Sequence, residues 1–320
     1  MIRVLFFLYM SALVLPYLSA QDAASTSTRI YDITPSREIS PQPFVYESRI
    51  RKEGWDTLTQ VQFWRKVMRT PPEFGYVSLA SNRKVLANIK AEFYDNLNYQ
   101  QKRELKDSVR RHYELPNGEL VYVTYGRSDF YQIRKAMPNI HKAVPLFEAE
   151  GVPAWYAQSI LLIESPGKDQ MSSTGAYGPF QLMKSVAIEQ GLKVNSKVDE
   201  RIIFDKAARA SAKLIRNVCI PKTRSMLQQQ GIAYQETDLW FRLLVLHVYH
   251  AGSGNVSGAL RKCKTRVGGP ALIQELWYTK YRGFGNASQN YSQVALAAYL
   301  ELESLIRKEY KVVKKRVAMP

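Results

Sequence analysis

Apolar residues recur at intervals of three and four along most of the chain, which is the spacing of helices that bury one face. The first such stripe begins near residue 57 and stops at the Pro71-Pro72 pair. Proline at position 138 predicts a break within one of the later stripes, since its ring removes a backbone donor. The pattern predicts helices over residues 57–70, 82–97, 99–113, 131–150, 153–164, 180–190, 205–218, 237–250 and 291–306.

Three segments depart from the helical pattern. Residues 119–125 alternate between apolar and polar after an Asn-Gly turn, which predicts a short strand. Residues 21–50 are rich in Ser, Thr, Pro and Gln and predict a flexible leader. Residues 307–320 predict a basic, solvated tail. Between them we expect an N-terminal, mainly helical region over 51–140, which carries no recognisable chemistry, and a larger helical domain over 141–306.

The N-terminus indicates the compartment. A basic lead ending at Arg3 is followed by an apolar run over 4–15 and by Ala20, a small residue at the expected cleavage point. This layout predicts a secretory signal peptide over 1–20, with an uncleaved membrane anchor as the alternative, and hence export to the periplasm or cell envelope. No later segment is apolar for long enough to predict a transmembrane helix.

The net charge of the chain indicates which class of partner it attracts. The sequence has 45 Lys and Arg against 28 Asp and Glu, a formal net charge of +17, and this excess predicts attraction to a polyanion. Export argues against nucleic acid and leaves an anionic cell wall or membrane surface. No feature indicates an oligomeric state.

Two cysteines, Cys219 and Cys263, predict one disulfide in an oxidising compartment, with two separate buried thiols as the alternative. Together with four scattered histidines they show no metal-ligand spacing, so we expect no metal.

Glu164 is the residue with the clearest candidate chemistry. It closes an apolar segment and shares a helical face with Ala157, Ile160 and Leu161. On its own, a glutamate at a helix end is more often a solvated side chain. If it is desolvated instead, its pKa rises and it becomes a proton donor near neutral pH.

Four short sequence blocks favour a catalytic role for Glu164 over that of a solvated side chain. They are Glu164-Ser165, the segment 172–183 with two glycines three residues apart, the turn 249–256 and Tyr291. In this order they resemble the catalytic domain of the soluble lytic transglycosylases, a family related to goose-type lysozyme. The resemblance covers roughly residues 140–305. It implies a lysozyme-like all-helical catalytic domain and does not reach the N-terminal part. With the helical pattern of residues 51–140, we expect a mainly α fold in which a smaller, mainly helical N-terminal region precedes that domain.

The resemblance also implies a role for each matching residue. Glu164 would be the single catalytic acid/base, and Ser173 would lie near it or hold the acylamino sugar. Gln181 and Met183 would line a sugar groove, in the first turns of a helix. Tyr249 and the backbone of Ala251 would form the groove floor, next to His250, where the family usually has Asn. Tyr291 would steady Glu164 by a hydrogen bond.

The implied reaction is cleavage of the bond between N-acetylmuramic acid and N-acetylglucosamine in peptidoglycan, with formation of a 1,6-anhydro ring and without a cofactor. Ala287 replaces the Glu that the family pattern would supply, so Glu164 is the one carboxylate of the blocks. Three alternatives remain open: a lysozyme-like muramidase, a non-catalytic peptidoglycan-binding protein, and a basic adaptor at a membrane surface.

Overall fold

The computed structural model describes residues 27–35, 41–164 and 171–318. It is 54% helical with 16% strand and contains two three-stranded antiparallel sheets. The expectation of an all-helical, lysozyme-like fold is therefore wrong. The predicted signal peptide lies outside the described residues. Among the residues that are described, no helix is long and apolar enough to cross a membrane.

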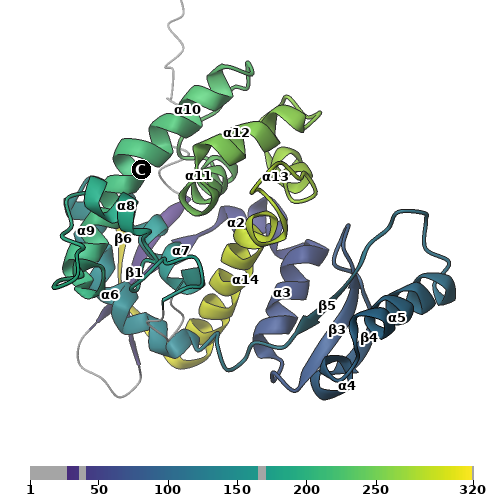
Figure 1. The fold of residues 1–320 in the computed structure, drawn as a ribbon. Helices are drawn as coiled ribbons and strands as arrows, with labels where there is room; N and C mark the ends of the chain where they lie inside the picture. Colours follow the sequence, from purple (N-terminus) through teal and green to yellow (C-terminus); the bar gives the residue numbers. More distant parts are fainter. Residues whose placement is uncertain (1–26, 36–40, 165–170, 319–320) are drawn as a thin grey trace, which may run out of the picture.

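Helix α14 (Asn286–Glu309) runs through the middle of the molecule (Figure 1). It packs against α3 (Thr59–Arg69), α7 (Ala154–Glu164) and α11 (Leu239–Ala251). Helices α7 and α11 are apolar nearly all round and almost wholly buried, because neighbours cover them on every side. These contacts form the core and bring the C-terminal ends of α7 and α11 close together.

The remaining helices surround this core. Proline at position 138 does not break α6, which is continuous because its buried face packs against α7 and α9 and compensates for the missing backbone bond. The elements are α2 (Arg49–Lys52), a 3-10 turn (Trp55–Thr57), α6 (Ile133–Ala149), α8 (Lys184–Glu189), a 3-10 turn (Glu200–Ile202), α9 (Phe204–Leu214), a π-helical turn (Ile215–Cys219), α10 (Ile220–Gln228), α12 (Ser253–Lys262) and α13 (Pro270–Leu276).

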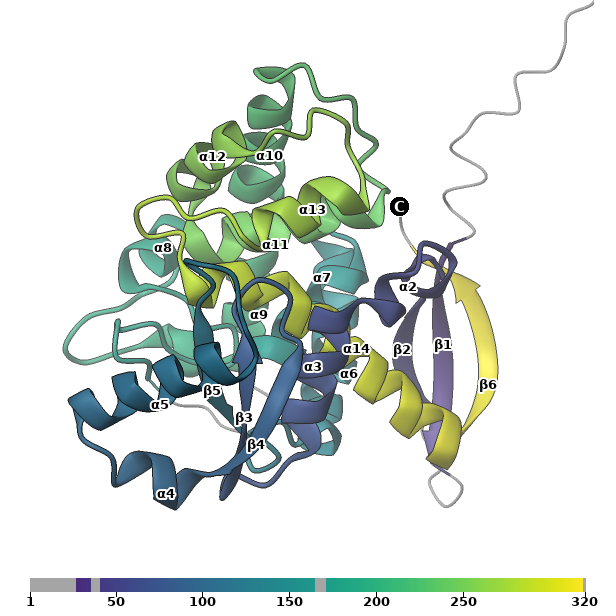
Figure 2. The same cartoon turned by 90° about the vertical axis from the view of Figure 1, so that its right-hand side faces the viewer.

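The first sheet has the order β2-β1-β6 and joins the two ends of the described chain (Figure 2). Its strands are β1 (Thr28–Pro35), β2 (Gln42–Glu47) and β6 (Tyr310–Val317). Two interpretations of the sequence are corrected here: most of the described part of the expected flexible leader is strand, and so is most of the expected basic tail. Strand β1 pairs with the nearby β2 and, on its other edge, with β6 almost the whole chain away. Arg316 of β6 is held by Glu148 at 3.1 Å.

The second sheet, β4-β3-β5, lies on the other side of α3 and α14 in a small lobe with α4 (Ala91–Asp95) and α5 (Tyr99–His112). Its strands are β3 (Phe74–Leu79), β4 (Val85–Lys90) and β5 (Val121–Tyr125). The predicted strand and the 99–113 helix are confirmed, and Asn98 caps the latter. The predicted 82–97 helix is wrong over β4, Val85–Lys90, and is confirmed only over α4, Ala91–Asp95. Ile89 is buried against Val77 and Val121 across the sheet, and this pairing outweighs the local helical spacing.

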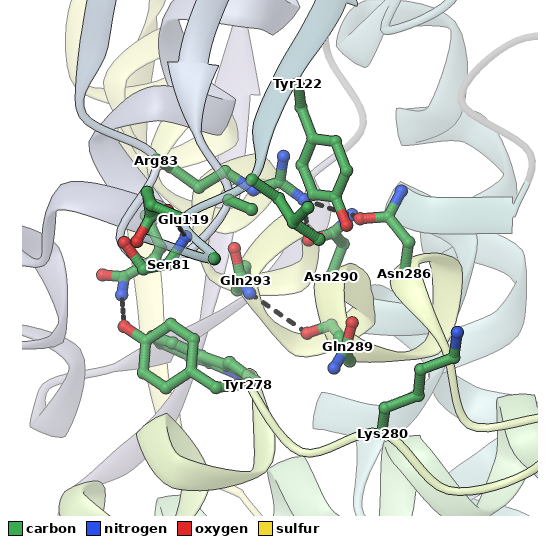
Figure 3. Close-up of a pocket in the computed structure, with 15 residues that line it drawn as sticks. Ser81, Arg83, Glu119, Tyr122, Tyr278, Lys280, Asn286, Gln289, Asn290 and Gln293 are labelled. Atoms are coloured by element: carbon green, nitrogen blue, oxygen red, sulfur yellow. Dashed lines mark hydrogen bonds between the residues drawn. The ribbon is translucent and has the colours of Figure 1, made fainter. Parts of the chain in front are cut away.

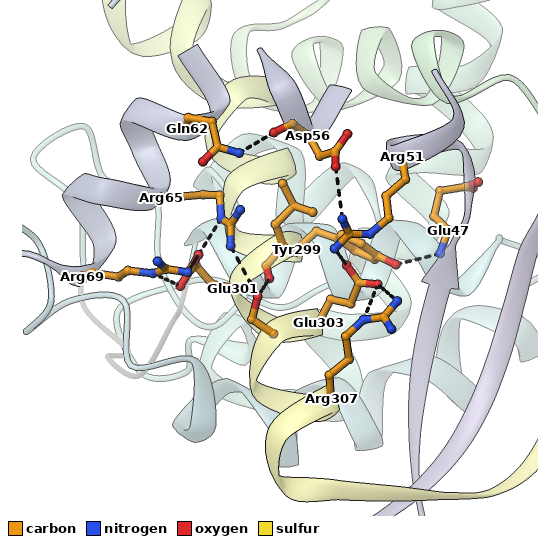
Figure 4. Close-up of polar contacts among 12 residues, drawn as sticks. Glu47, Arg51, Asp56, Gln62, Arg65, Arg69, Tyr299, Glu301, Glu303 and Arg307 are labelled. Carbon is orange, nitrogen blue, oxygen red and sulfur yellow. Dashed lines mark hydrogen bonds and ion pairs between the residues drawn. The ribbon is translucent and has the colours of Figure 1, made fainter. Parts of the chain in front are cut away.

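Ion pairs join α14 to helices α2 and α3 (Figure 4). Glu301 accepts from Arg65 at 2.7 Å and from Arg69 at 2.6 Å, both on α3. Glu303 pairs with Arg51 at 2.7 Å and with Arg307 at 2.6 Å. The side chains of Glu301 and Glu303 are nearly buried, so their ion pairs fix the orientation of α14 relative to α3 and α2.

The predicted disulfide is absent: Cys219 and Cys263 are both free and buried. The Cys263 thiol lies 3.6 Å from the Ala259 carbonyl and 3.6 Å from the Thr279 hydroxyl. Cys219 lies in the π-helical turn, where burial raises its pKa to about 12. Both thiols are packed as small core side chains, which is the alternative that the sequence left open.

Candidate active site

A pocket of about 370 Å³ opens where α7 and α11 end. We call it the Glu164 pocket. Glu164 is the last residue of α7, and Tyr249 and His250 lie in the last turn of α11. The loop before α8 closes one side, and apolar residues from α8, α9 and the π-helical turn close another. Those apolar side chains are Val186, Leu214 and Val218.

Glu164 sits in this pocket as a weak acid. Tyr291 of α14 donates a hydrogen bond from its hydroxyl to Glu164 Oε1 at 2.6 Å. Desolvation raises the pKa of Glu164 to about 7, although the Tyr291 hydrogen bond acts in the opposite direction. The described residues supply no salt bridge to this carboxyl group. A carboxyl group with this pKa can both give and take a proton near neutral pH.

The hydroxyl of Tyr291 is aimed by a stacking contact. Its ring stacks on that of His250, with centroids 4.4 Å apart and planes 22° apart. His250 keeps an exposed edge at the pocket rim, while desolvation of its inner side lowers its pKa. A neutral imidazole therefore covers the tyrosine and adds no positive charge next to Glu164.

The loop 171–183 owes its shape to glycine and to one arginine. A Cβ on Gly178 would lie 2.1 Å from the Arg201 carbonyl oxygen, and the φ of Gly178 is +78°, so only glycine fits. The guanidinium of Arg201 donates to the carbonyls of Gly175 at 2.8 Å and Leu182 at 3.0 Å. Asp199 holds that guanidinium at 2.7 Å. The loop is thus a rigid wall of the pocket.

The structure brings five predicted residues into the pocket lining: Glu164, Gln181, Met183, Tyr249 and His250. Tyr249 forms part of the wall, where its hydroxyl donates to the Phe180 carbonyl at 2.6 Å. Gln181 and Met183 were expected in the first turns of a helix, which is wrong. Gln181 has a φ of +46°, so α8 begins only after Met183.

Three predicted residues lie outside the lining. Tyr291 reaches the site through its hydrogen bond to Glu164, as expected. Ser173 is exposed, and its neighbour Ser172 lines the pocket instead. Ser172 also accepts from the Ala176 backbone at 2.9 Å. Ala251 ends α11, and its carbonyl accepts from the Asn255 side chain at 2.9 Å, so that group is already occupied.

Two residues of the site were missed from the sequence. Glu189 of α8 is exposed and lines the pocket, which gives the site a second carboxylate. Its place three residues after Val186, on the same helical face, is the signal that could have found it. Arg201 carried no such signal, since its role depends on carbonyls some 20 residues earlier in the chain. Within the described residues, no group of three His, Cys, Asp or Glu could hold a metal.

Comparison of the chain with models of known protein families and with curated proteins gives no match.

Proposed function

We propose that this protein is an exported peptidoglycan lytic transglycosylase with Glu164 as its acid and base. The observation that supports this most directly is the carboxyl group of Glu164, which has a pKa of about 7 and lies in a pocket beside the loop that Gly178 shapes. The resemblance of the four sequence blocks to the soluble lytic transglycosylases supplies the reaction class. The formal charge of +17 suits an anionic wall polymer as substrate.

In the first step, protonated Glu164 gives its proton to the oxygen that joins N-acetylmuramic acid to N-acetylglucosamine. The bond from that oxygen to the muramic anomeric carbon breaks, and the neighbouring N-acetyl group stabilises the positive charge at this carbon. Glu164 is now ionised. The Tyr291 hydroxyl, 2.6 Å away, donates to it and stabilises this charged form.

In the second step, Glu164 takes the proton of the muramic 6-hydroxyl while that oxygen attacks the anomeric carbon. A 1,6-anhydro ring forms, and Glu164 returns to its protonated state. No water is consumed. The apolar side of the pocket, with Val186, Leu214 and Val218, disfavours water beside the reacting carbon.

Glu189 favours a second candidate, a muramidase that hydrolyses the same bond. Hydrolysis by glycosidases ordinarily uses two carboxylates, one as acid and one as nucleophile or base. Glu164 and Glu189 line the same pocket and could divide those roles.

The experiment is mass spectrometry of the products after purified peptidoglycan is incubated with the full-length protein. We expect muropeptides that end in 1,6-anhydromuramic acid. Glu164→Gln keeps the shape of the side chain but removes the titratable group, and it should lower product formation by about a thousandfold.

The matched variant is Glu189→Gln. The transglycosylase predicts that this variant still forms anhydro products, whereas the muramidase predicts loss of activity. Reducing muramic ends in place of anhydro ends would establish the muramidase. Binding of peptidoglycan without any cleavage would instead support a non-catalytic wall protein.

A further inference from the structure

A second pocket, of about 320 Å³, lies between the β4-β3-β5 lobe and helix α14 (Figure 3). We call it the Arg83 pocket. The lobe contributes Ser81, Arg83, Glu119 and Tyr122, and α14 contributes an amide-rich face. That face consists of Asn286, Gln289, Asn290 and Gln293. The pocket therefore joins the region without recognised chemistry to the helix that carries Tyr291.

Arg83 is buried here without a carboxylate partner. Its residue exposure is 5%, and its guanidinium lies 4.9 Å from the ring centroid of Tyr122. Nη2 donates to Asn286 Oδ1 and Asn290 Oδ1, both at 2.8 Å. Among the described residues no salt bridge reaches it, and desolvation lowers its pKa. Since arginine does not lose its proton in proteins, the positive charge remains.

Elsewhere in the buried core, arginine has a carboxylate partner. Arg242 is 2% exposed, and Glu47 lies 3.5 Å from its guanidinium. Such pairing is usual because an uncompensated buried charge is unfavourable by several kcal/mol. At Arg83 the hydrogen bonds both leave from Nη2 and end on neutral amides. Nε and Nη1 make none of these hydrogen bonds. Because Cδ lies between them they form no common edge, so each can donate a single hydrogen bond to an anion that enters the pocket.

The surroundings of Arg83 favour a carboxylate on a peptide. A carboxylate oxygen accepts a strong, charge-assisted hydrogen bond from a single guanidinium donor. Amide side chains such as Gln289 and Gln293 offer both a donor and an acceptor, as a peptide backbone requires. Glu119 also lines the pocket, where its Oε1 accepts from the Ser81 backbone at 3.1 Å. The lining thus carries two cations, Arg83 and Lys280, and one carboxylate, Glu119, which suits a ligand with carboxylates and an ammonium group.

We propose that the Arg83 pocket binds a carboxylate-bearing peptide. On the proposed function, which this step depends on, that peptide is the stem peptide of the glycan strand being cut. Asn290 accepts from Arg83, and the next residue, Tyr291, donates to Glu164. One helix thus carries a contact of each pocket, so that a strand with an intact stem peptide is held at both.

The experiment is isothermal titration calorimetry of the full-length protein with a free stem tetrapeptide that carries no sugar, Ala-Glu-diaminopimelate-Ala. The same peptide with all carboxylates amidated and inorganic phosphate are the comparison ligands. We expect the acid peptide to bind at least about tenfold more tightly than the amide, since a hydrogen bond to a charged group accounts for such a factor. Phosphate should bind more weakly than the acid peptide.

The decisive variant is Asn286→Asp. It keeps the side-chain shape and places a carboxylate against Arg83, which should weaken the acid peptide by about tenfold or more while the protein stays folded. Asn88→Asp adds the same charge on an exposed part of β4 and should leave affinity unchanged. Equal affinity of Asn286→Asp and the unaltered protein would overturn the proposal, and so would equal binding of acid and amide peptides, tighter binding of phosphate, or no binding.

This test is independent of the chemistry at Glu164. Glu164→Gln should bind the acid peptide as tightly as the unaltered protein does. Peptide binding without any cleavage of peptidoglycan would count against the proposed enzyme alone. Cleavage without peptide binding would count against the Arg83 pocket alone.

Discussion

The Glu164 and Arg83 pockets present the same physical situation with opposite charge. In each pocket burial desolvates an ionisable side chain, Glu164 or Arg83, that no described residue pairs in a salt bridge. Burial raises the pKa of the carboxyl group and lowers that of the guanidinium, because in both cases it disfavours the charged form. The outcomes differ because of the starting pKa. Glu164 reaches about 7 and can exchange its proton, whereas Arg83 stays charged.

The walls of the two pockets also differ. The Glu164 pocket depends on an irregular loop that one glycine and Arg201 hold in shape, while helix α14 and the ends of paired strands form much of the Arg83 pocket. Desolvation alone therefore does not define a function. A group that titrates near neutrality serves for proton transfer, and a permanent charge serves for binding.

The largest expected effect is on the loop that only the Glu164 pocket uses. Gly178→Ala forces a left-handed φ and a 2.1 Å contact with the Arg201 carbonyl, and we expect it to lower the free energy of unfolding by about 3 kcal/mol. Gly175→Ala is the matched control, because its φ is also positive but nothing lies within 4 Å; it should cost about 1 kcal/mol. Urea denaturation measures both. Equal losses would show that the contact with Arg201 is not what shapes the wall.

The next effect concerns the pH dependence of stability. The folded pKa of Glu164, about 7, lies above its ordinary value of 4.5, so the folded state binds more protons between these values. The stability contribution of the protonated carboxyl group is therefore complete below pH 4.5 and is lost as pH rises through 7.

Glu164→Gln has no such dependence. We expect the free energy of unfolding of the unaltered protein, relative to this variant, to fall by about 2 kcal/mol between pH 5 and pH 8. Subtracting the variant removes the opposite contribution of His247, whose pKa is lowered to about 3 by desolvation. A difference that stays constant with pH would mean that Glu164 is not desolvated.

A smaller effect distinguishes the hydrogen bond that Tyr291 donates to Glu164 from the proton transfer that Glu164 itself carries out. Tyr291→Phe removes the hydrogen bond that lowers the pKa of Glu164, so this pKa should rise above 7. The basic limb of the pH–rate profile should move upward, by at most about one pH unit, and the rate at pH 7 should fall by about tenfold. A lower rate with an unmoved profile would assign Tyr291 a packing role only.

The smallest effect is on the stability of the Arg83 pocket. Asn286→Asp gives Arg83 a counter-charge at the distance where Asn286 now accepts, and it should raise the free energy of unfolding by about 1 kcal/mol at pH 7. The aspartate pKa would be depressed by the guanidinium, so the gain is lost as pH falls through that lowered value. Asn88→Asp should show no gain. A destabilised Asn286→Asp protein would show that the amides and the rings of Phe63, Trp64 and Tyr122 already stabilise the charge of Arg83.

Local patterns predicted the elements whose sequence and packing agree. Helices α7 and α11 are apolar over nearly their whole length, and α5 carries its own cap, so each forms where the spacing indicates. The strands of the first sheet could not be found in this way. Residues 28–35 pair with 310–317, and no local window contains both partners. At 85–90, apolar spacing favoured a helix, and pairing with β3 overrode it, whereas 91–95 is helical as the spacing indicates.

The residue pattern alone indicated Glu164 at the end of an apolar helix, the glycines that let a loop approach it, and Tyr291 far along the chain. Only the tertiary structure decided that Tyr291 donates to Glu164, that Ser172 replaces Ser173 in the pocket, and that Glu189 joins them. It also left Arg83 buried against neutral amides. The physical reason is that pKa and hydrogen bonding depend on burial, which arises from contacts between residues distant in sequence.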